Sequence, residues 1–125
     1  MSRSKYVPRR GDVIQLNFDP QPGHGQAGRR PALVLSPTDF NRQTGRAVEC
    51  PITNQPRGYP WEVEIPDNPE VSGVVLADQV KTLDWQARRA EFVCTPDEEI
   101  LTDVVEKAIA LIDPIDEDEK DDEGD

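Results

Sequence analysis

Short apolar segments, separated by turns rich in proline and glycine, dominate the pattern of this chain. Some segments alternate between apolar and polar residues, which predicts half-buried strands, whereas continuous apolar runs predict strands covered on both faces. The alternation is clear in residues 12–18, where Ile14, Leu16 and Phe18 share one face. The predicted strands are residues 12–18, 31–35, 46–52, 61–65, 73–77 and 91–94, with residues 78–85 continuing the sheet.

Two helices are expected beside these strands. Segment 36–45 predicts a turn or a short helix that stops at its glycine. In the second helix Thr95 is expected to cap the first turn, Pro96 fits that turn, and Glu98 closes a capping box. The helix should pack on the sheet through one apolar stripe, which consists of Ile100, Leu101, Val104, Val105, Ala108, Ile109 and Ile112.

These elements indicate a mainly β fold of one domain. About six short strands, a C-terminal helix and many turns favour a small, strongly twisted antiparallel barrel of the SH3-like type. The whole chain has 125 residues, and we assign the domain to residues 1–112. Residues 113–125 hold nine acidic residues and one lysine, so they are expected to form a disordered acidic tail.

The net charge of −11 is unevenly distributed along the chain. The first 60 residues hold 9 Lys and Arg against 4 Asp and Glu, a net charge of +5, and the remaining residues are strongly acidic. The overall charge argues against nonspecific coating of nucleic acid, but a basic first half can present a local phosphate-binding face.

Cysteine content and hydropathy indicate the compartment. Cys50 and Cys94 are too few for a disulfide framework, so we expect two free, structural thiols in a reducing compartment. The chain has no apolar run long enough to span a membrane, and residues 1–10 lack the apolar centre of a signal peptide. A cytoplasmic protein is therefore expected.

Several kinds of catalytic site are excluded by composition. His24 is the only histidine, so one chain cannot build a two-histidine ribonuclease mechanism or a histidine-rich metal site. Phosphate-loop, dinucleotide-binding and nucleophile-elbow motifs are also missing from the sequence. Catalysis must then rest on arginine, threonine, amides, carboxylates or thiols, and we expect neither a metal nor a cofactor.

Polar residues cluster at the predicted strand ends, where a rigid sheet can present them to a ligand. Arg30 lies at the start of a buried strand and faces Thr53 at the end of the next one. The planar fork of an arginine in this position suits the binding of a phosphate group. Trp61 and Trp85 are expected in the core instead, because tryptophan is usually well buried.

The order of several short motifs resembles the MazF/PemK-type toxins over nearly all of residues 6–112. The motifs are Tyr6-Val7-Pro8, Gly11-Asp12, Phe18-Asp19-Pro20, Gln26-Ala27-Gly28, Arg30-Pro31-Ala32, Leu35-Ser36-Pro37, Gly58-Tyr59-Pro60 and Leu76-Ala77-Asp78-Gln79-Val80-Lys81. The resemblance implies an SH3-like barrel that forms a homodimer and acts as the endoribonuclease half of a type II toxin–antitoxin pair. Its expected partners are single-stranded RNA and a MazE-like antitoxin.

The resemblance also implies site residues and a reaction. Arg30 and Thr53 match the catalytic pair, which cleaves single-stranded mRNA at a specific sequence without a metal and leaves 2′,3′-cyclic phosphate and 5′-hydroxyl ends. The chain departs from well-known members at Gly25 and Asn54. The implied RNA contacts are Arg29, Asn54, Gln55, Arg57, Tyr59, Asp78, Gln79 and Lys81.

Two other functions compete with the nuclease. One is a noncatalytic CcdB-like topoisomerase poison on the same fold. The other is an SH3-like binding module, whose peptide groove needs clustered exposed aromatic side chains. The chain has only 2 Trp, 2 Tyr and 3 Phe, most of which the core requires. The arginine–threonine pair favours the nuclease over both.

Overall fold

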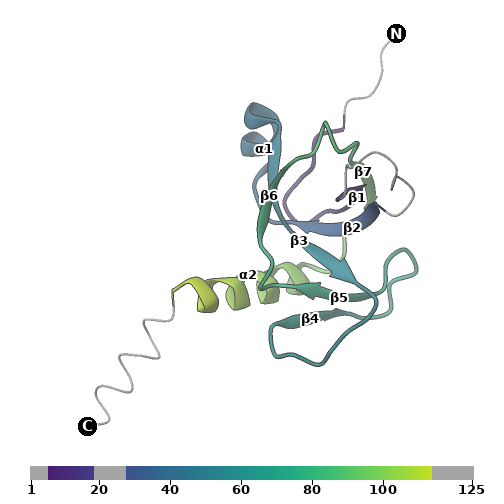
Figure 1. Cartoon of the computed structure of the whole chain (residues 1–125), viewed down its shortest axis with the longest axis vertical. Coiled ribbons are helices and arrows are strands. Elements are labelled where there is room, and N and C mark those ends of the chain that lie inside the picture. Colours follow the sequence, from purple (N-terminus) through teal and green to yellow (C-terminus); the bar gives the residue numbers. More distant parts are fainter. Residues whose placement is uncertain (1–5, 19–27, 114–125) are drawn as a thin grey trace.

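The computed structural model describes residues 6–18 and 28–113, which form seven strands and two helices (Figure 1). All strand pairs are antiparallel. The elements are β1 (Val13–Asn17), β2 (Arg29–Val34), α1 (Thr38–Thr44), β3 (Arg46–Thr53), β4 (Glu62–Ile65), β5 (Gly73–Leu76), β6 (Lys81–Asp84), β7 (Glu91–Cys94) and α2 (Glu98–Ile112). The predicted strands and both helices are therefore present, with shifted ends.

Strand β3 organises the sheet, because it pairs with three neighbours. Its residues Arg46–Glu49 pair with β6, its residues Glu49–Pro51 pair with β2 on the other side, and its last two residues pair with β5. The change of partner on this side falls around Pro51, which has no N–H to donate to a ladder. The strand order is β4-β5-β3-β2-β1-β7, with β6 beside β3.

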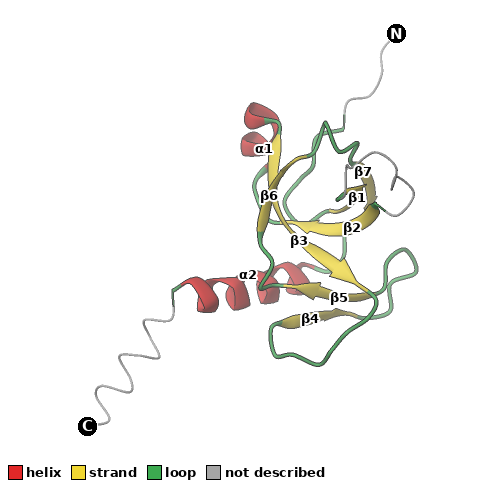
Figure 2. Cartoon of the chain, in the orientation of Figure 1, coloured by secondary structure: helices red, strands yellow, loops and turns green. Residues whose placement is uncertain are grey.

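The mainly β, antiparallel class is confirmed, but the sheet does not close into a full barrel. In the described part of the chain, β4 and β7 end the strand order and do not pair with each other. Figure 2 shows the resulting curled sheet, in which α1 packs against β3 and α2 against β4. The change of partner along β3 divides the sheet into two parts, one with β1, β2, β6 and β7 and the other with β4 and β5. The start of β2 and the end of β3 lie where these two parts join.

Both faces of the central strands are buried, which the alternating pattern of β1 did not predict. Val13 is as fully buried as Ile14, although their side chains point to opposite faces. One face packs with Ile100 and Val104 of α2 and with the β4–β5 hairpin. The other face packs around Trp85, whose indole nitrogen donates to the Asn41 carbonyl at 2.9 Å. The half-buried pattern expected of β1 therefore holds for Gln15 and Asn17, which are only partly buried, and fails at Val13, which is fully buried.

Helix α2 begins differently from the prediction. Its N-cap residue is Asp97, and no side chain caps the first turn. The Thr95 hydroxyl instead donates to the buried carboxylate of Asp12 at 3.0 Å, and the Tyr6 hydroxyl donates to the other oxygen of that carboxylate at 2.5 Å. The predicted capping box is wrong because Asp12 binds the threonine that would have formed it.

The apolar stripe of α2 is buried only along part of the helix. Ile100, Val104 and Ala108 are buried, whereas Ile109 and Ile112 are 54% and 73% exposed. Neither helix in the described ranges is long and apolar enough to cross a membrane. The predicted acidic tail begins at Asp113, and its remaining residues lie outside the described part of the chain.

Candidate active site

The ends of β2 and β3 bring the two predicted catalytic residues together. Ala32 of β2 lies opposite Pro51 of β3. Continuing this register by two residues places Arg30 opposite Thr53, on the same face of the sheet. Both residues also line the same two hollows at this place, while their catalytic role stays a prediction.

Arg30 and Thr53 lie between two adjoining hollows, which we call together the cleft. The hollows have volumes of about 630 and 440 Å³, and both are lined by Arg30, Ile52, Thr53 and Gln55. Eight of the ten predicted site residues line the larger hollow, and the smaller one adds Arg29 and Asn54. The eight are Arg30, Thr53, Gln55, Arg57, Tyr59, Asp78, Gln79 and Lys81.

The hydroxyl of Thr53 is oriented by its own turn. Its oxygen accepts a hydrogen bond from the Gln55 N–H at 3.1 Å, which leaves the hydroxyl proton available for a ligand. Gly73 of β5 packs closely on the same residue, with φ at +113°. A Cβ at Gly73 would lie 2.0 Å from the Thr53 carbonyl oxygen, so only glycine fits here.

Arg30 is exposed in the cleft and, within residues 6–18 and 28–113, its guanidinium makes no ion pair or hydrogen bond. Two further cations, Arg57 and Lys81, line the larger hollow, together with the acidic residues Glu62 and Asp78. A free guanidinium beside an available hydroxyl is a suitable pair of groups for binding a phosphate.

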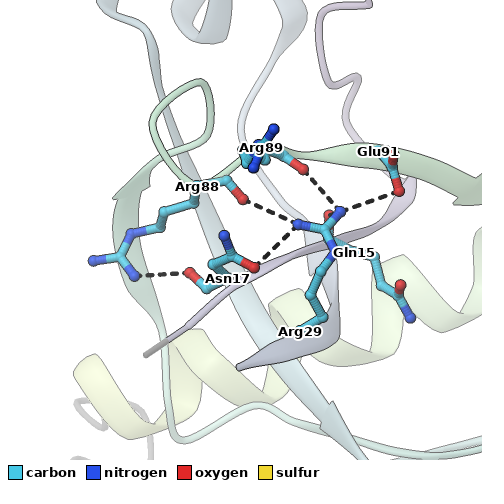
Figure 3. Close-up of polar contacts among 6 residues, drawn as sticks. All are labelled: Gln15, Asn17, Arg29, Arg88, Arg89 and Glu91. Carbon is cyan, nitrogen blue, oxygen red and sulfur yellow. Dashed lines mark hydrogen bonds and ion pairs between the residues drawn. The ribbon is translucent and has the colours of Figure 1, made fainter. Parts of the chain in front are cut away.

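Arg29 also borders the smaller hollow, but its guanidinium already has partners (Figure 3). It donates to the carbonyls of Arg89 at 2.8 Å and Gln15 at 3.3 Å. It also pairs with the Glu91 carboxylate at 3.1 Å and bonds Asn17 Oδ1 at 3.2 Å. These contacts hold the turn before β7 against β1 and β2, next to Arg30.

The turn between β3 and β4 is ordered by a carboxylate and an aromatic stack. Glu62 accepts hydrogen bonds from the backbone N–H groups of Arg57 at 3.1 Å and Gly58 at 3.0 Å. Tyr59 stacks on Trp61 with ring centroids 4.9 Å apart and an interplanar angle of 18°. Trp61 was expected in the core; it is partly buried and packs against the core cluster, and it also stacks with Tyr59 at the wall of the cleft.

Another part of the cleft wall is formed by the turn between β5 and β6. The Gln79 N–H donates to the Leu76 carbonyl at 3.0 Å, which fixes this turn beside the cleft. Lys81, at the start of β6, places its ammonium 5.8 Å from the centroid of the Phe18 ring. This contact directs a long, flexible cation along the wall of the larger hollow.

Glu49 was not among the predicted site residues, although it lies in the same region. It belongs to β3, is 0% exposed, and is the Cα partner of Lys81 on β6. Burial raises the pKa of its carboxyl to about 7, although the charges of Lys81 and Arg88 act in the opposite direction. The sequence pattern that could have indicated the burial of Glu49 is its place in the alternation of β3, on the same face as Ala47 and Pro51.

The thiols lie outside the cleft. Cys50 and Cys94 are free and buried, as expected. Burial raises the pKa of the Cys50 thiol to about 12, so this group is a poor nucleophile at neutral pH. Within the described ranges, no group of three or more His, Cys, Asp or Glu residues is arranged to hold a metal ion.

Comparison with known proteins identifies the family. The family model described as "PemK-like, MazF-like toxin of type II toxin-antitoxin system" matches residues 9–112. The endoribonuclease toxin MazF of Escherichia coli K12 is 52% identical over 87 residues, which cover 70% of this chain and 78% of that protein. The endoribonuclease toxin ChpB of the same strain is 37% identical over 108 residues, which cover 82% and 92%.

Solved structures agree in fold. A MazF structure from Deinococcus radiodurans has a TM-score of 0.79 and 49% identity, and the match covers 86% of this chain and 98% of that one. A MazE–MazF structure from the same organism has a TM-score of 0.78 and 44% identity, covering 87% and 98%. The chain belongs to the PemK-like, MazF-like toxin family of type II toxin–antitoxin systems.

Proposed function

We propose that this protein is a toxin endoribonuclease that cleaves single-stranded mRNA at a specific sequence in the cleft where the start of β2 adjoins the end of β3. The observation that carries the proposal is that Arg30, whose guanidinium has no partner within residues 6–18 and 28–113, and Thr53, whose hydroxyl is available, line the same two hollows. The family model and the endoribonuclease relatives support the same activity.

Arg30 and Thr53 fit an internal transesterification. The ribose 2′-oxygen forms a bond to phosphorus, the bond from phosphorus to the 5′-oxygen breaks, and the products are a 2′,3′-cyclic phosphate and a 5′-hydroxyl. The proton lost by the 2′-hydroxyl is balanced by the proton gained by the leaving 5′-oxygen. Arg30 stays charged at neutral pH, so it neutralises the phosphorane oxygens, while Thr53 donates a hydrogen bond to them.

The cleft walls supply groups for holding RNA. Arg57 and Lys81 bind phosphates, and the exposed face of Tyr59 stacks on a base. The amides and the carboxylate near Arg30 read base edges; these residues are Asn54, Gln55, Asp78 and Gln79. We assign Arg29 to positioning β2, because its guanidinium is already bonded to the neighbouring turn.

The partners follow from the relatives. A solved MazE–MazF structure supports an antitoxin of the MazE type as the neutralising partner. We further propose that the protein acts as a homodimer in the cytoplasm, where its mRNA substrate occurs. We also keep residues 1–112 as the toxin domain and residues 113–125 as an acidic tail. The topoisomerase poison is not retained, because the curated relatives are endoribonucleases.

Cleavage of a mixed-sequence single-stranded RNA in EDTA tests the function. The wild-type protein should produce cyclic-phosphate ends, and Arg30→Ala should lower the cleavage rate by about 100-fold or more, as for a lost oxyanion donor. Thr53→Val keeps the shape of the side chain without its hydroxyl, and it should also lower the rate strongly.

Arg46→Ala is the matched control, because Arg46 lies at the opposite end of β3 and is exposed. It should cleave at the wild-type rate. Equal rates for wild type and Arg30→Ala would move the chemistry away from this pair, and absence of cleavage by the wild-type protein across diverse RNA would refute the nuclease.

A further inference from the structure

Glu49 is an unusual residue for the interior of a sheet. Its side chain is 0% exposed, and neither carboxylate oxygen has a hydrogen-bond partner within the described ranges. An ionised carboxylate in this state has lost its hydration without gaining hydrogen bonds, which is costly. A protonated carboxyl in the same place costs much less. A change in nearby charge therefore shifts the protonation equilibrium of Glu49 strongly.

The charges around Glu49 come from the strand and turn that border the cleft. Lys81 of β6 is its Cα partner, and Arg88, in the turn after β6, is the second cation acting on it. Arg88 is held in place, because its guanidinium donates to the carbonyls of Asn17 at 2.9 Å and Phe18 at 3.1 Å. Glu49 has no ion pair with either cation within 4.0 Å.

The other packed elements add few free charges on this face. The partner of Glu49 on β2 is Val34, and the apolar cluster on this face holds Ile14 and Leu16 of β1. The carboxylate of Asp12, which precedes β1, is bonded by Tyr6 and Thr95. The charged residues of α1, Asp39 and Arg42, are exposed and pair with each other at 3.0 Å, while Arg30 lies at the cleft.

Lys81 connects the buried carboxylate to the ligand. Lys81 lines the larger hollow together with Phe18 and Pro51, so its ammonium belongs both to the cleft and to the surroundings of Glu49. An RNA phosphate bound at Lys81 would bring negative charge close to Glu49 and draw the ammonium away from it. Both changes disfavour the ionised carboxylate.

We propose that Glu49 takes up a proton when RNA phosphates occupy the cleft beside Lys81, so that the protonation state of this buried carboxyl sets the affinity for RNA. The inference rests on the proposed function. Because linkage is reciprocal, RNA must bind more tightly when Glu49 is already protonated. The raised pKa of about 7 places this effect in the neutral range.

The expected direction is stronger binding at lower pH. At pH 8.5 Glu49 is ionised and opposes the bound phosphates, whereas at pH 6 it is neutral. One bound phosphate acting across the cleft wall should change the affinity by about tenfold between these two values. The proton uptake should be greatest near neutral pH, where free Glu49 is partly ionised.

Calorimetric titration with an uncleavable RNA tests the proposal. The probe is the RNA that the wild-type protein cleaves, carrying 2′-O-methyl groups so that the 2′-oxygen cannot attack. His24→Gln serves as the parent protein, because it removes the only histidine. Titrations at pH 7 in two buffers of different ionisation enthalpy count the protons taken up, and titrations at pH 6 and 8.5 give the affinity change.

Three proteins are compared in this experiment. The parent should take up protons and lose about tenfold in affinity at the higher pH. Adding Glu49→Gln should remove both effects, because the amide cannot titrate. Adding Glu106→Gln should preserve both effects. This substitution also removes one carboxylate, but at an exposed position of α2 outside the cleft. Equal proton uptake with and without Glu49→Gln would overturn the proposal.

A second measurement protects the test against misfolding of Glu49→Gln. Carbon NMR of glutamate carboxyl groups in the parent should show one buried carboxyl whose titration midpoint rises when the RNA probe is added. An unchanged midpoint would overturn the proposal. Failure of the wild-type protein to cleave or bind any RNA would instead refute the proposed function, so the two failures are distinguishable.

Discussion

Two neighbouring arginines at the start of β2 differ in almost every respect. Arg29 points to one face, where its guanidinium bonds Gln15, Asn17, Arg89 and Glu91 (Figure 3). Arg30 points to the other face and makes none of these contacts, although it lies in the cleft beside Thr53. One residue type, at adjacent positions, therefore provides a structural connection on one side and, among the residues that the structure describes, a cation without a partner on the other.

This difference shows how the fold keeps a charge available for a ligand. Arg29 fastens β1, β2 and the turn before β7, so the strand that presents Arg30 is held without using Arg30 itself. A guanidinium that is positioned by its strand and still unpaired loses less freedom when it binds a phosphate. Substitutions around either arginine therefore test this difference.

The largest effect on stability is expected at Gly73, which packs tightly against Thr53 on the face of the sheet that carries Arg30. In Gly73→Ala the new Cβ would overlap the Thr53 carbonyl, so the backbone must shift, at a cost of about 3 kcal/mol or more in the free energy of unfolding. Cleavage should fall in the remaining folded protein, because Thr53 moves relative to Arg30. Urea unfolding and single-turnover cleavage measure the two effects.

Gly45→Ala is the matched control for Gly73→Ala. Gly45 also has a positive φ, at +70°, but its nearest neighbour to a new Cβ is the flexible end of Gln86 at 3.6 Å. It should lose about 1 kcal/mol in stability and keep its cleavage rate. Equal destabilisation of the two variants would contradict a specific role for the close contact with Thr53.

Glu49 provides the next largest effect, because its burial makes stability depend on pH. The folded pKa of about 7 lies above the ordinary value of 4.5, so the folded protein binds more protons than the unfolded one between these values. Stability should therefore fall as pH rises from about 4.5 to 7 and stay low above it. Glu49→Gln should remove this loss, which amounts to about 3 kcal/mol at pH 8.

Chemical denaturation of both proteins at pH 5 and pH 8 measures the effect of Glu49. The stability gain of Glu49→Gln over wild type should be larger at pH 8 than at pH 5. The same gain at both pH values would show that Glu49 titrates normally. Glu106→Gln should behave like wild type at both.

Arg29→Lys disrupts the hydrogen bonds and the ion pair that Arg29 makes on its face of the sheet, and its expected effect is smaller. Lysine keeps the charge but cannot reach the several acceptors around the guanidinium, so about 2 kcal/mol of stability should be lost. Cleavage should fall several-fold through misplacement of β2, while the salt dependence of RNA binding stays unchanged because the charge is kept. Thermal unfolding and binding at several salt concentrations test this.

The control for Arg29→Lys is Arg42→Lys, at an arginine with one exposed ion pair, to Asp39. An exposed pair of this kind contributes little, so the expected loss is within about 0.5 kcal/mol. If Arg29→Lys reduced the salt slope while leaving stability intact, Arg29 would be a phosphate contact instead of a structural one.

Tyr59→Leu probes the cleft wall and should have the smallest effect. Tyr59 is 46% exposed and stacks on Trp61, so its free face is available to a base. Leucine removes base stacking, and RNA affinity should weaken by about 5- to 10-fold with little loss of stability. Phe40→Leu, at an exposed aromatic residue of α1, should leave affinity unchanged, and fluorescence anisotropy with labelled RNA separates the two.

The candidate site was largely predictable from local sequence, because its residues lie at strand ends and turns. Motifs of adjacent residues placed Arg30, Thr53 and Tyr59 around one ligand, and all three line the cleft. The partners of Arg29 were not predictable, since they are contributed by residues up to 62 positions away. The burial of Glu49 was missed for the same reason: its neighbours belong to other strands.

The sequence by itself determined the order and type of the elements, because apolar alternation and turn residues act over a few positions. It also determined the chemical groups that a phosphate site needs and, through several motifs in order, the family. Within the described ranges, only the tertiary structure decided which arginine has no partner, that Asp12 binds the hydroxyl of Thr95, and that the sheet stays open. Those outcomes depend on contacts between distant segments, and such contacts override local preference when they satisfy a buried polar group.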